Sequence, residues 1–391
     1  MKRFGCIVVL FFSCCFLSLQ AQESKNLTYS LFSGYGYVAR TNDFMLGENV
    51  DNANINSILN FAFEITKDVD GSKAWHHLYN NIHFGAGLFY GRFNYSKNLG
   101  NPFGLYGLMG FTPVNTHRWQ FKTDIALGIS GIWDGYSQEN YYNIAVSTAI
   151  ECLIHARLQL QYNISGNWHA GLSGAFVHFS NGCIRRPNKG INIITPSVSV
   201  SYNPQKIVKQ PYDNYVKHIP NVQRLVGMYS AVKGTWVDYT KDVSLTTGDT
   251  VRDTIRGTYA VFGLQYRQMY NLAAKHNLGV GGDISYNNVI GRTKGAYYKW
   301  KTKDKTFDAQ RLTISAFVSY EYNINRFSLL AEPIVYLYKP ENTYFTRLAQ
   351  RIGMRYQFYK GWYYQLTLRA YQFTKADYIE GGIGYRFKYR M

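Results

Sequence analysis

The sequence predicts an all-β protein, a transmembrane antiparallel β-barrel of about sixteen strands in an outer membrane. Three observations favour this class. Only 17% of the 391 residues are charged, whereas soluble domains usually carry about a quarter. Aromatic residues are abundant, with 35 Tyr, 24 Phe and 7 Trp, as in barrels with aromatic girdles at both lipid interfaces. Apolar and polar residues also alternate along extended stretches, which is the period of a β-strand with one oily face.

The first 22 residues have the pattern of a secretory signal peptide. Two basic residues, Lys2 and Arg3, precede a mainly apolar run at 7–19 and a polar start at Glu23. The run is shorter than the roughly 17 residues that a transmembrane helix needs. We therefore expect residues 1–22 to be removed and residues 23–391 to form the barrel.

The alternation is clearest in two long stretches. Even positions between 142 and 162 are mostly apolar, and the odd positions include Asn, Ser, Glu, His, Arg and Gln. The stretch 312–322 repeats the same split. Strands of soluble sandwiches usually have about five or six residues, whereas these are long enough to cross a bilayer at a tilt. We expect the apolar face to meet lipid and the polar face to line the lumen.

Turn residues divide the chain into sixteen such strands, an even number that leaves both chain ends in the periplasm. The first eight are expected at 28–40, 55–66, 78–91, 102–113, 118–133, 142–163, 167–179 and 191–203. The second eight are expected at 222–238, 256–271, 277–288, 309–324, 326–338, 343–358, 361–373 and 378–389. A segment with three prolines, 203–221, separates the sets. It is a join between two halves, a small plug or an ordinary long turn, and the sequence leaves open whether the strands close one barrel or two.

A group of polar residues ends the seventh expected strand. His178 and Ser180 are two positions apart and so share a face with the apolar Leu172 and Phe176. Asn192 falls on the apolar face of the next strand. Odd strands rise from the periplasm, which takes this hairpin to the outer rim. Polar side chains beside lipid cost stability, and a nucleophile, a base and an orienting group would explain their presence.

This hairpin resembles the outer-membrane lipid A 3-O-deacylases, also called acyloxyacyl-hydrolase-like proteins. The resemblance rests on His-Phe-Ser-Asn-Gly at 178–182, on Pro-Asn-Lys-Gly-Ile at 187–191, and on a third residue fourteen positions after the histidine. It covers the N-terminal half, 23–203. Residues 204–391 are expected to add further strands.

The resemblance implies an esterase that removes an ester-linked acyl chain from lipid A or a related lipid at the outward-facing rim. His178 would be the general base and Ser180 the nucleophile. The third position is Glu in the family and Asn192 here. An amide can hold a histidine tautomer, but it cannot neutralise the imidazolium that forms. Asn181 and Asn188 match family asparagines, and Asn188 is expected to donate to the oxyanion.

Charged residues near the motif complete the predicted site. Glu139, in the neighbouring outer loop, is a reserve candidate for the missing acid. Arg185, Arg186 and Lys189 are expected to bind the anionic head group of lipid A. Loss of Lys2 and Arg3 with the signal peptide reduces the formal net charge of +18 to +16. Because the chain is exported, this charge indicates a lipopolysaccharide partner rather than a nucleic acid. No cofactor and no metal is implied. The alternative function is a non-catalytic channel or structural barrel, which the lumen of a sixteen-stranded barrel would permit.

Two cysteines, Cys152 and Cys183, lie beyond the signal peptide. Cys152 is expected in mid-strand on the lipid face and Cys183 in an outer loop. A disulfide needs Cα atoms within roughly 7 Å. We therefore predict two unpaired thiols.

Overall fold

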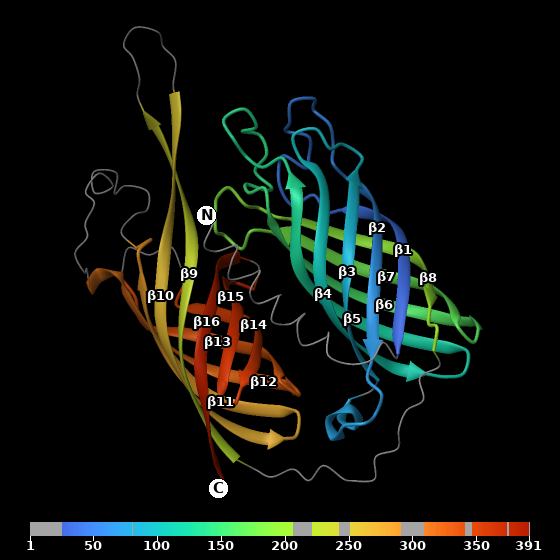
Figure 1. Cartoon of the computed structure of the whole chain (residues 1–391). Helices are drawn as coiled ribbons and strands as arrows, with labels where there is room; N and C mark the ends of the chain where they lie inside the picture. The colour runs from blue at the N-terminus through green and yellow to red at the C-terminus, as the bar shows by residue number, and fades with distance from the viewer. Residues whose placement is uncertain are drawn as a thin grey trace. The chain divides into compact units, whose positions relative to one another are not determined.

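A computed structural model describes residues 26–79, 81–205, 221–241, 251–290, 309–340, 346–373 and 375–390. These residues form sixteen antiparallel strands, which confirms the predicted class and count. The strands close into two barrels of eight rather than one of sixteen (Figure 1). The expected signal peptide and most of the segment between the halves lie outside the described residues. Within them, no helix is both long and apolar enough to cross a membrane.

The first barrel, blue to green in Figure 1, is a meander of eight strands in which β8 pairs with β1 to close the wall. Its strands are β1 (Leu27–Val38), β2 (Ser57–Asp68), β3 (Ile82–Phe93), β4 (Gly100–Asn115), β5 (Trp119–Trp133), β6 (Glu151–Ser165), β7 (Trp168–Ser180) and β8 (Ile191–Tyr202). We call the end that carries the segments 39–56, 94–99, 134–150 and 181–190 the loop end, and the opposite end the turn end.

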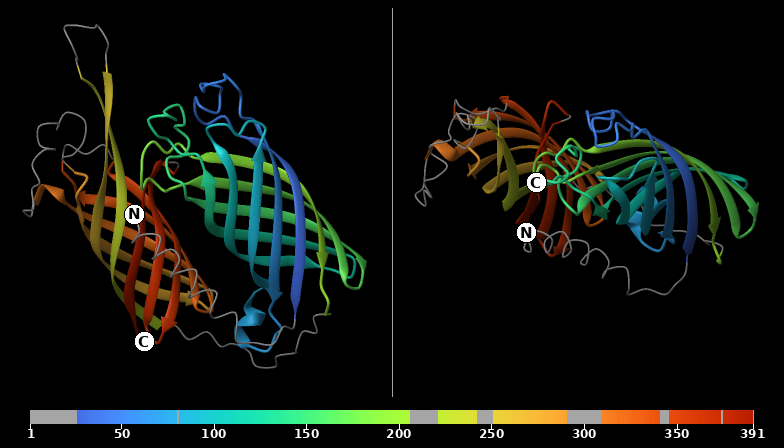
Figure 2. Two further views of the ribbon diagram at one scale, coloured as in Figure 1. Left: turned by 45° about the horizontal axis from the view of Figure 1, so that its top comes forward. Right: turned by 90° about the horizontal axis from the view of Figure 1, so that it is seen from above.

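The second barrel, yellow to red, is closed by β9, which pairs with both β10 and β16. Its strands are β9 (Asn221–Lys241), β10 (Val251–Ala273), β11 (His276–Asn287), β12 (Leu312–Ile324), β13 (Phe327–Tyr338), β14 (Leu348–Tyr359), β15 (Trp362–Tyr371) and β16 (Lys375–Arg390). The strands of each barrel run obliquely around its wall (Figure 2), as closure of a sheet requires.

Three strands begin four or more residues later than the sequence pattern indicates. β3 begins at Ile82, β6 at Glu151 and β14 at Leu348, instead of 78, 142 and 343. Before β3, residues 74–78 form a 3₁₀ helix, η1. Before β6, the Asn143 side chain donates to the carbonyls of Asn98 (2.9 Å) and Asp134 (2.8 Å). These bonds fold residues 142–150 into a loop although their apolar alternation continues.

The lumen of the first barrel is filled by a buried ionic network. The Arg157 guanidinium contacts Glu64 at 2.6 Å and Asp124 at 2.7 Å, and all three side chains are almost fully buried. His83 binds the second oxygen of Asp124 at 2.7 Å, and the Tyr106 hydroxyl donates to Glu64 at 2.7 Å. Buried charges are tolerated where they are paired and hydrogen-bonded. The polar face of each strand therefore forms a packed interior.

The second barrel is filled in the same way. Arg351 contacts Glu332 and Glu380 at 2.6 Å and Asp283 at 2.7 Å. Arg369 shares Asp283 at 2.7 Å and Glu380 at 2.8 Å. Eight strands enclose an interior just wide enough for side chains. The wide lumen of a single sixteen-stranded barrel, on which the channel alternative depends, is therefore absent from the described residues.

Candidate active site

The end of β7 presents alternate residues to opposite sides of the first barrel. Phe179 points inward, is fully buried, and packs against Trp133 and Phe89 with ring centroids 5.0 and 5.7 Å away. His178 and Ser180 flank it and therefore point outward, as do the exposed Leu172 and Phe176 further along the strand. The buried aromatic contact fixes the strand end from which both polar side chains project.

The pairing of β7 with β8 places His178 directly opposite Asn192. The imidazole Nδ1 lies 2.6 Å from Asn192 Oδ1, and its Nε2 lies 3.0 Å from Ser180 Oγ. An amide oxygen only accepts, so Nδ1 carries the hydrogen and Nε2 presents its lone pair to the Ser180 hydroxyl. This is the tautomer that a general base for a serine nucleophile requires.

Gly190 allows the loop before β8 to pass close to the imidazole. Its φ is +72°, and a Cβ at this position would lie 2.9 Å from His178 Cε1. Its N–H donates to Ala145 O at 2.9 Å, and the N–H of Lys189 donates to Ile144 O at 3.1 Å. Only glycine can adopt this positive φ and also leave room for the His178 imidazole beside the backbone. The loop 181–190 is thereby bound to the loop 134–150.

The two asparagines of the loop 181–190 have different surroundings. Asn181 is buried, with its side chain donating to Ser147 Oγ at 3.0 Å. Its backbone N–H donates to Asn188 Oδ1 at 3.3 Å. Asn188 is half-buried, and this bond occupies its oxygen while leaving its Nδ2 group to donate elsewhere. The Asn188 amide group is thus a candidate hydrogen-bond donor to an oxyanion, and Asn181 is a candidate support that holds Asn188 in place.

The charged candidates lie in the loops and not within the His178 hydrogen-bond array. Glu139 is exposed, and hydrogen bonds from its own backbone N–H and from Ser137 hold the pKa of its carboxyl below the usual value. Both ring nitrogens of His178 are already bound to Asn192 and Ser180. The position beside the imidazole that an acid would take is therefore occupied by the amide.

The basic residues beside the motif all belong to the loop 181–190. Arg186 and Lys189 are exposed and Arg185 is half-buried.

Cys152 was expected in mid-strand, but it is the second residue of β6 and pairs directly with Ser180. The error follows from the nine-residue misplacement of the β6 start. Cys152 and Cys183 are both free thiols, as predicted.

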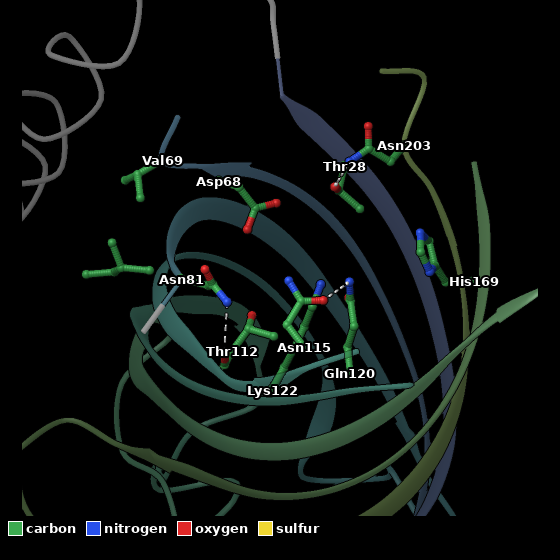
Figure 3. A pocket seen from close by; sticks show the side chains of 11 residues that line it. Thr28, Asp68, Val69, Asn81, Thr112, Asn115, Gln120, Lys122, His169 and Asn203 are labelled. Carbon is green, nitrogen blue, oxygen red and sulfur yellow. Dashed lines mark hydrogen bonds between the residues drawn. The ribbon is translucent and has the colours of Figure 1, made fainter. Parts of the chain in front are cut away.

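A separate cavity of about 460 Å³ opens at the turn end of the first barrel (Figure 3). It is lined by Thr28, Asp68, Val69, Asn81, Ile82, Thr112, Asn115, Gln120, Lys122, His169 and Asn203. His169 stands near the start of β7 and His178 near its end, so this cavity is distinct from the Ser180 site. Among the described residues, no group of three His, Cys, Asp or Glu side chains is placed to hold a metal ion.

The fold and the site define an outer-membrane β-barrel with a serine–histidine pair on its outward face. Comparison with protein families specifies the class further. Residues 59–201 match the family described as lipid A 3-O-deacylase (PagL), and residues 239–389 match the C-terminal domain of acyloxyacyl hydrolase. The chain is therefore similar to the lipid A 3-O-deacylase family over two matched segments, and the resemblance extends beyond the N-terminal half in which the sequence motif lies.

No curated protein matches the chain. Among solved structures, a mutant of the Rh. blastica porin is 8% identical, with a TM-score of 0.17, and the match covers 92% of this chain and 99% of the porin. The toluene transporter TodX of Pseudomonas putida is 10% identical, with a TM-score of 0.20 and coverages of 96% and 91%.

Proposed function

We propose that this protein is an outer-membrane esterase that removes an ester-linked acyl chain from lipid A or a related lipid. The observation that carries the proposal is the hydrogen-bonded array from Asn192 through His178 to Ser180 on the outward face of the first barrel. The match of residues 59–201 to the deacylase family supports lipid A as the substrate class.

In the proposed reaction, Ser180 Oγ attacks the ester carbonyl while His178 Nε2 accepts the hydroxyl proton. The tetrahedral intermediate collapses when the imidazolium returns this proton to the departing sugar alkoxide. An acyl group then remains on Ser180. Water attacks that ester with His178 again as the base, and a free fatty acid leaves.

Two asparagines assist these steps. Asn192 Oδ1 holds the Nδ1 hydrogen of His178 and so keeps the lone pair on Nε2 toward the nucleophile. Asn188 Nδ2 is the side-chain donor proposed for the oxyanion that develops during attack. Such donors act mainly in the transition state and are typically worth about 10² to 10³ in kcat. Asn192 orients the His178 imidazole but carries no charge. We therefore expect a slower enzyme than one with a carboxylate at position 192.

The lipid is proposed to lie against the outside of the barrel. With the N-terminus in the periplasm, the loop end faces the exterior, which brings Ser180 to the outer leaflet. Exposed apolar side chains such as Leu172 and Ile194 line the wall below the site. Acyl chains would lie along this wall while Arg185, Arg186 and Lys189 bind anionic phosphate groups.

Mass spectrometry of lipid A from cells with and without the protein tests the proposal. Cells with the wild-type chain are expected to lose the mass of one hydroxyacyl group, and cells with Ser180→Ala are expected to keep it. Ser173→Ala on the same strand is the matched control, because it loses a hydroxyl bound to Ser197 at 2.7 Å without touching His178. Unchanged lipid A with wild-type protein correctly inserted would instead favour a structural barrel.

A further inference from the structure

Glu151 is a buried carboxylate at the loop end of the first barrel. It is 1% exposed, and its Oε1 accepts from the N–H of Thr148 at 3.1 Å and lies 2.7 Å from Thr148 Oγ1. Its other oxygen is buried, and no hydrogen-bond partner for it lies among the described residues. A buried, unsatisfied polar atom is destabilising. The loss of stability that such an atom causes suggests that Glu151 has a role other than packing.

Hydrogen bonds connect Glu151 to the residue that follows the nucleophile. Asn181 Nδ2 lies 3.0 Å from Ser147 Oγ and 3.4 Å from Thr148 Oγ1. Thr148 is held on its other side as well, since its hydroxyl also lies 2.7 Å from the carbonyl oxygen of Ile150. The chain of contacts therefore runs from Glu151 through Thr148 to Asn181, on the inner side of the wall that carries Ser180.

The same chain continues to the proposed oxyanion donor. The backbone N–H of Asn181 binds Asn188 Oδ1 at 3.3 Å. This bond sets the direction in which the Asn188 amide nitrogen points. The fixed position of Asn181 thus determines the placement of the Ser180 backbone on one side and of the Asn188 amide on the other.

We propose that Glu151 is a positioning residue for the esterase site, acting through Thr148 and Asn181 on the oxyanion donor Asn188. The inference rests on the proposed function and extends it to residues that never touch the substrate. Oxyanion binding matters in the transition state and little in the ground state. Loss of positioning should therefore lower kcat and leave KM nearly unchanged.

The first experiment measures kcat and KM of the purified full-length chain on lipid A in mixed detergent micelles. Glu151→Ala is expected to lower kcat by about 10- to 100-fold, in line with the effect of a displacement of about 1 Å near a reacting group. Glu151→Gln should restore most of it, because an amide oxygen still accepts from Thr148. Gln159→Ala is the matched control, since Gln159 faces the same lumen from the same strand and binds Ser199 at 2.9 Å.

The second experiment follows the contact chain. Thr148→Val, which keeps the shape and loses the hydroxyl, should lower kcat as Glu151→Ala does, and Thr148→Ser should not. The double variant of Glu151→Ala with Asn181→Ala should be no slower than Asn181→Ala alone, because both lie on one path. Heat-modifiable migration verifies that each variant is a folded barrel.

The outcomes separate this inference from the proposed function. If the wild-type chain releases no acyl chain, the proposed function fails. If it does, and Glu151→Ala keeps the wild-type kcat, Glu151 has no positioning role. A Gln variant as slow as the Ala variant, or a Gln159→Ala variant equally slow, would also overturn the inference, since hydrogen-bond acceptance at this place would then not be the cause.

Discussion

The substitution Asn192→Asp tests the electrostatics of the proposed site directly. Asparagine and aspartate have the same shape, and the strand register holds position 192 opposite His178 with a contact of 2.6 Å. The change therefore adds a negative charge and leaves the orientation of the imidazole as it is. We expect the rate of ester hydrolysis to rise, because a carboxylate stabilises the imidazolium formed when Ser180 loses its proton.

The contact geometry sets the size of the effect. Unit charges about 4 Å apart attract by about 1 kcal/mol in bulk water and about 4 kcal/mol at an effective dielectric constant near 20. His178 and Asn192 are both half-buried, which places the pair between these limits. Each 1.36 kcal/mol corresponds to a tenfold change in rate. The expected acceleration is therefore roughly 5-fold to about 1000-fold.

The assay is the initial rate of fatty-acid release from lipid A micelles by purified protein. Asn192→Leu is the matched control, because leucine fills a similar space and accepts no hydrogen bond, and it should be slower than wild type. An aspartate variant no faster than wild type, with its fold intact, would refute the electrostatic argument. A leucine variant as fast as wild type would remove Asn192 from the site altogether.

Four further outcomes are expected. Gly190→Ala should displace His178, because the added Cβ would lie too close to the imidazole. We expect the acyl-release assay to show about 100-fold lower activity and denaturant titration to show a free energy of unfolding lower by about 1–3 kcal/mol. The protein should show no porin-sized conductance in planar bilayers, because paired charges fill each lumen. Arg157→Ala should lower the free energy of unfolding by about 3–5 kcal/mol, because Glu64 and Asp124 would lose their buried cationic partner. In a chain whose native thiols are replaced by serine, Arg186→Cys should react with a membrane-impermeant label on intact cells and His117→Cys should not; the opposite result would invert the topology.

The strands were largely predictable because a barrel wall divides two environments along every strand. Lipid on one side and a packed polar interior on the other impose a period of two, as the burial of Thr195 and exposure of Ile194 illustrate. The start of β6 was not predictable in this way. Residues 142–150 continue the alternation, but side-chain bonds from Asn143 fold them into a loop.

The arrangement of His178, Ser180 and Asn192 followed from the sequence because it depends on one hairpin and its register. Closure into two barrels did not follow, since it depends on pairing between β1 and β8, which are distant in the chain. The contacts of Glu151 were also missed. They join residues of the loop 134–150 to Asn181, and the misplaced strand start hid that loop.

The position of Asn192 couples the proposed site to the closure of the first barrel. Its side chain orients His178 on β7, while its carbonyl oxygen accepts from the N–H of Ala39, just beyond β1. Asn192 thus stands at the seam where the last strand of the first barrel meets the first. The seam thus adds a second anchor to the backbone of Asn192, whose side chain orients the proposed base, His178, across the β7–β8 hairpin. A one-residue slip of β8 would turn Asn192 toward the lumen. We therefore expect the proposed site to be held most firmly in the closed barrel, in which β7 and β1 both fix the position of Asn192.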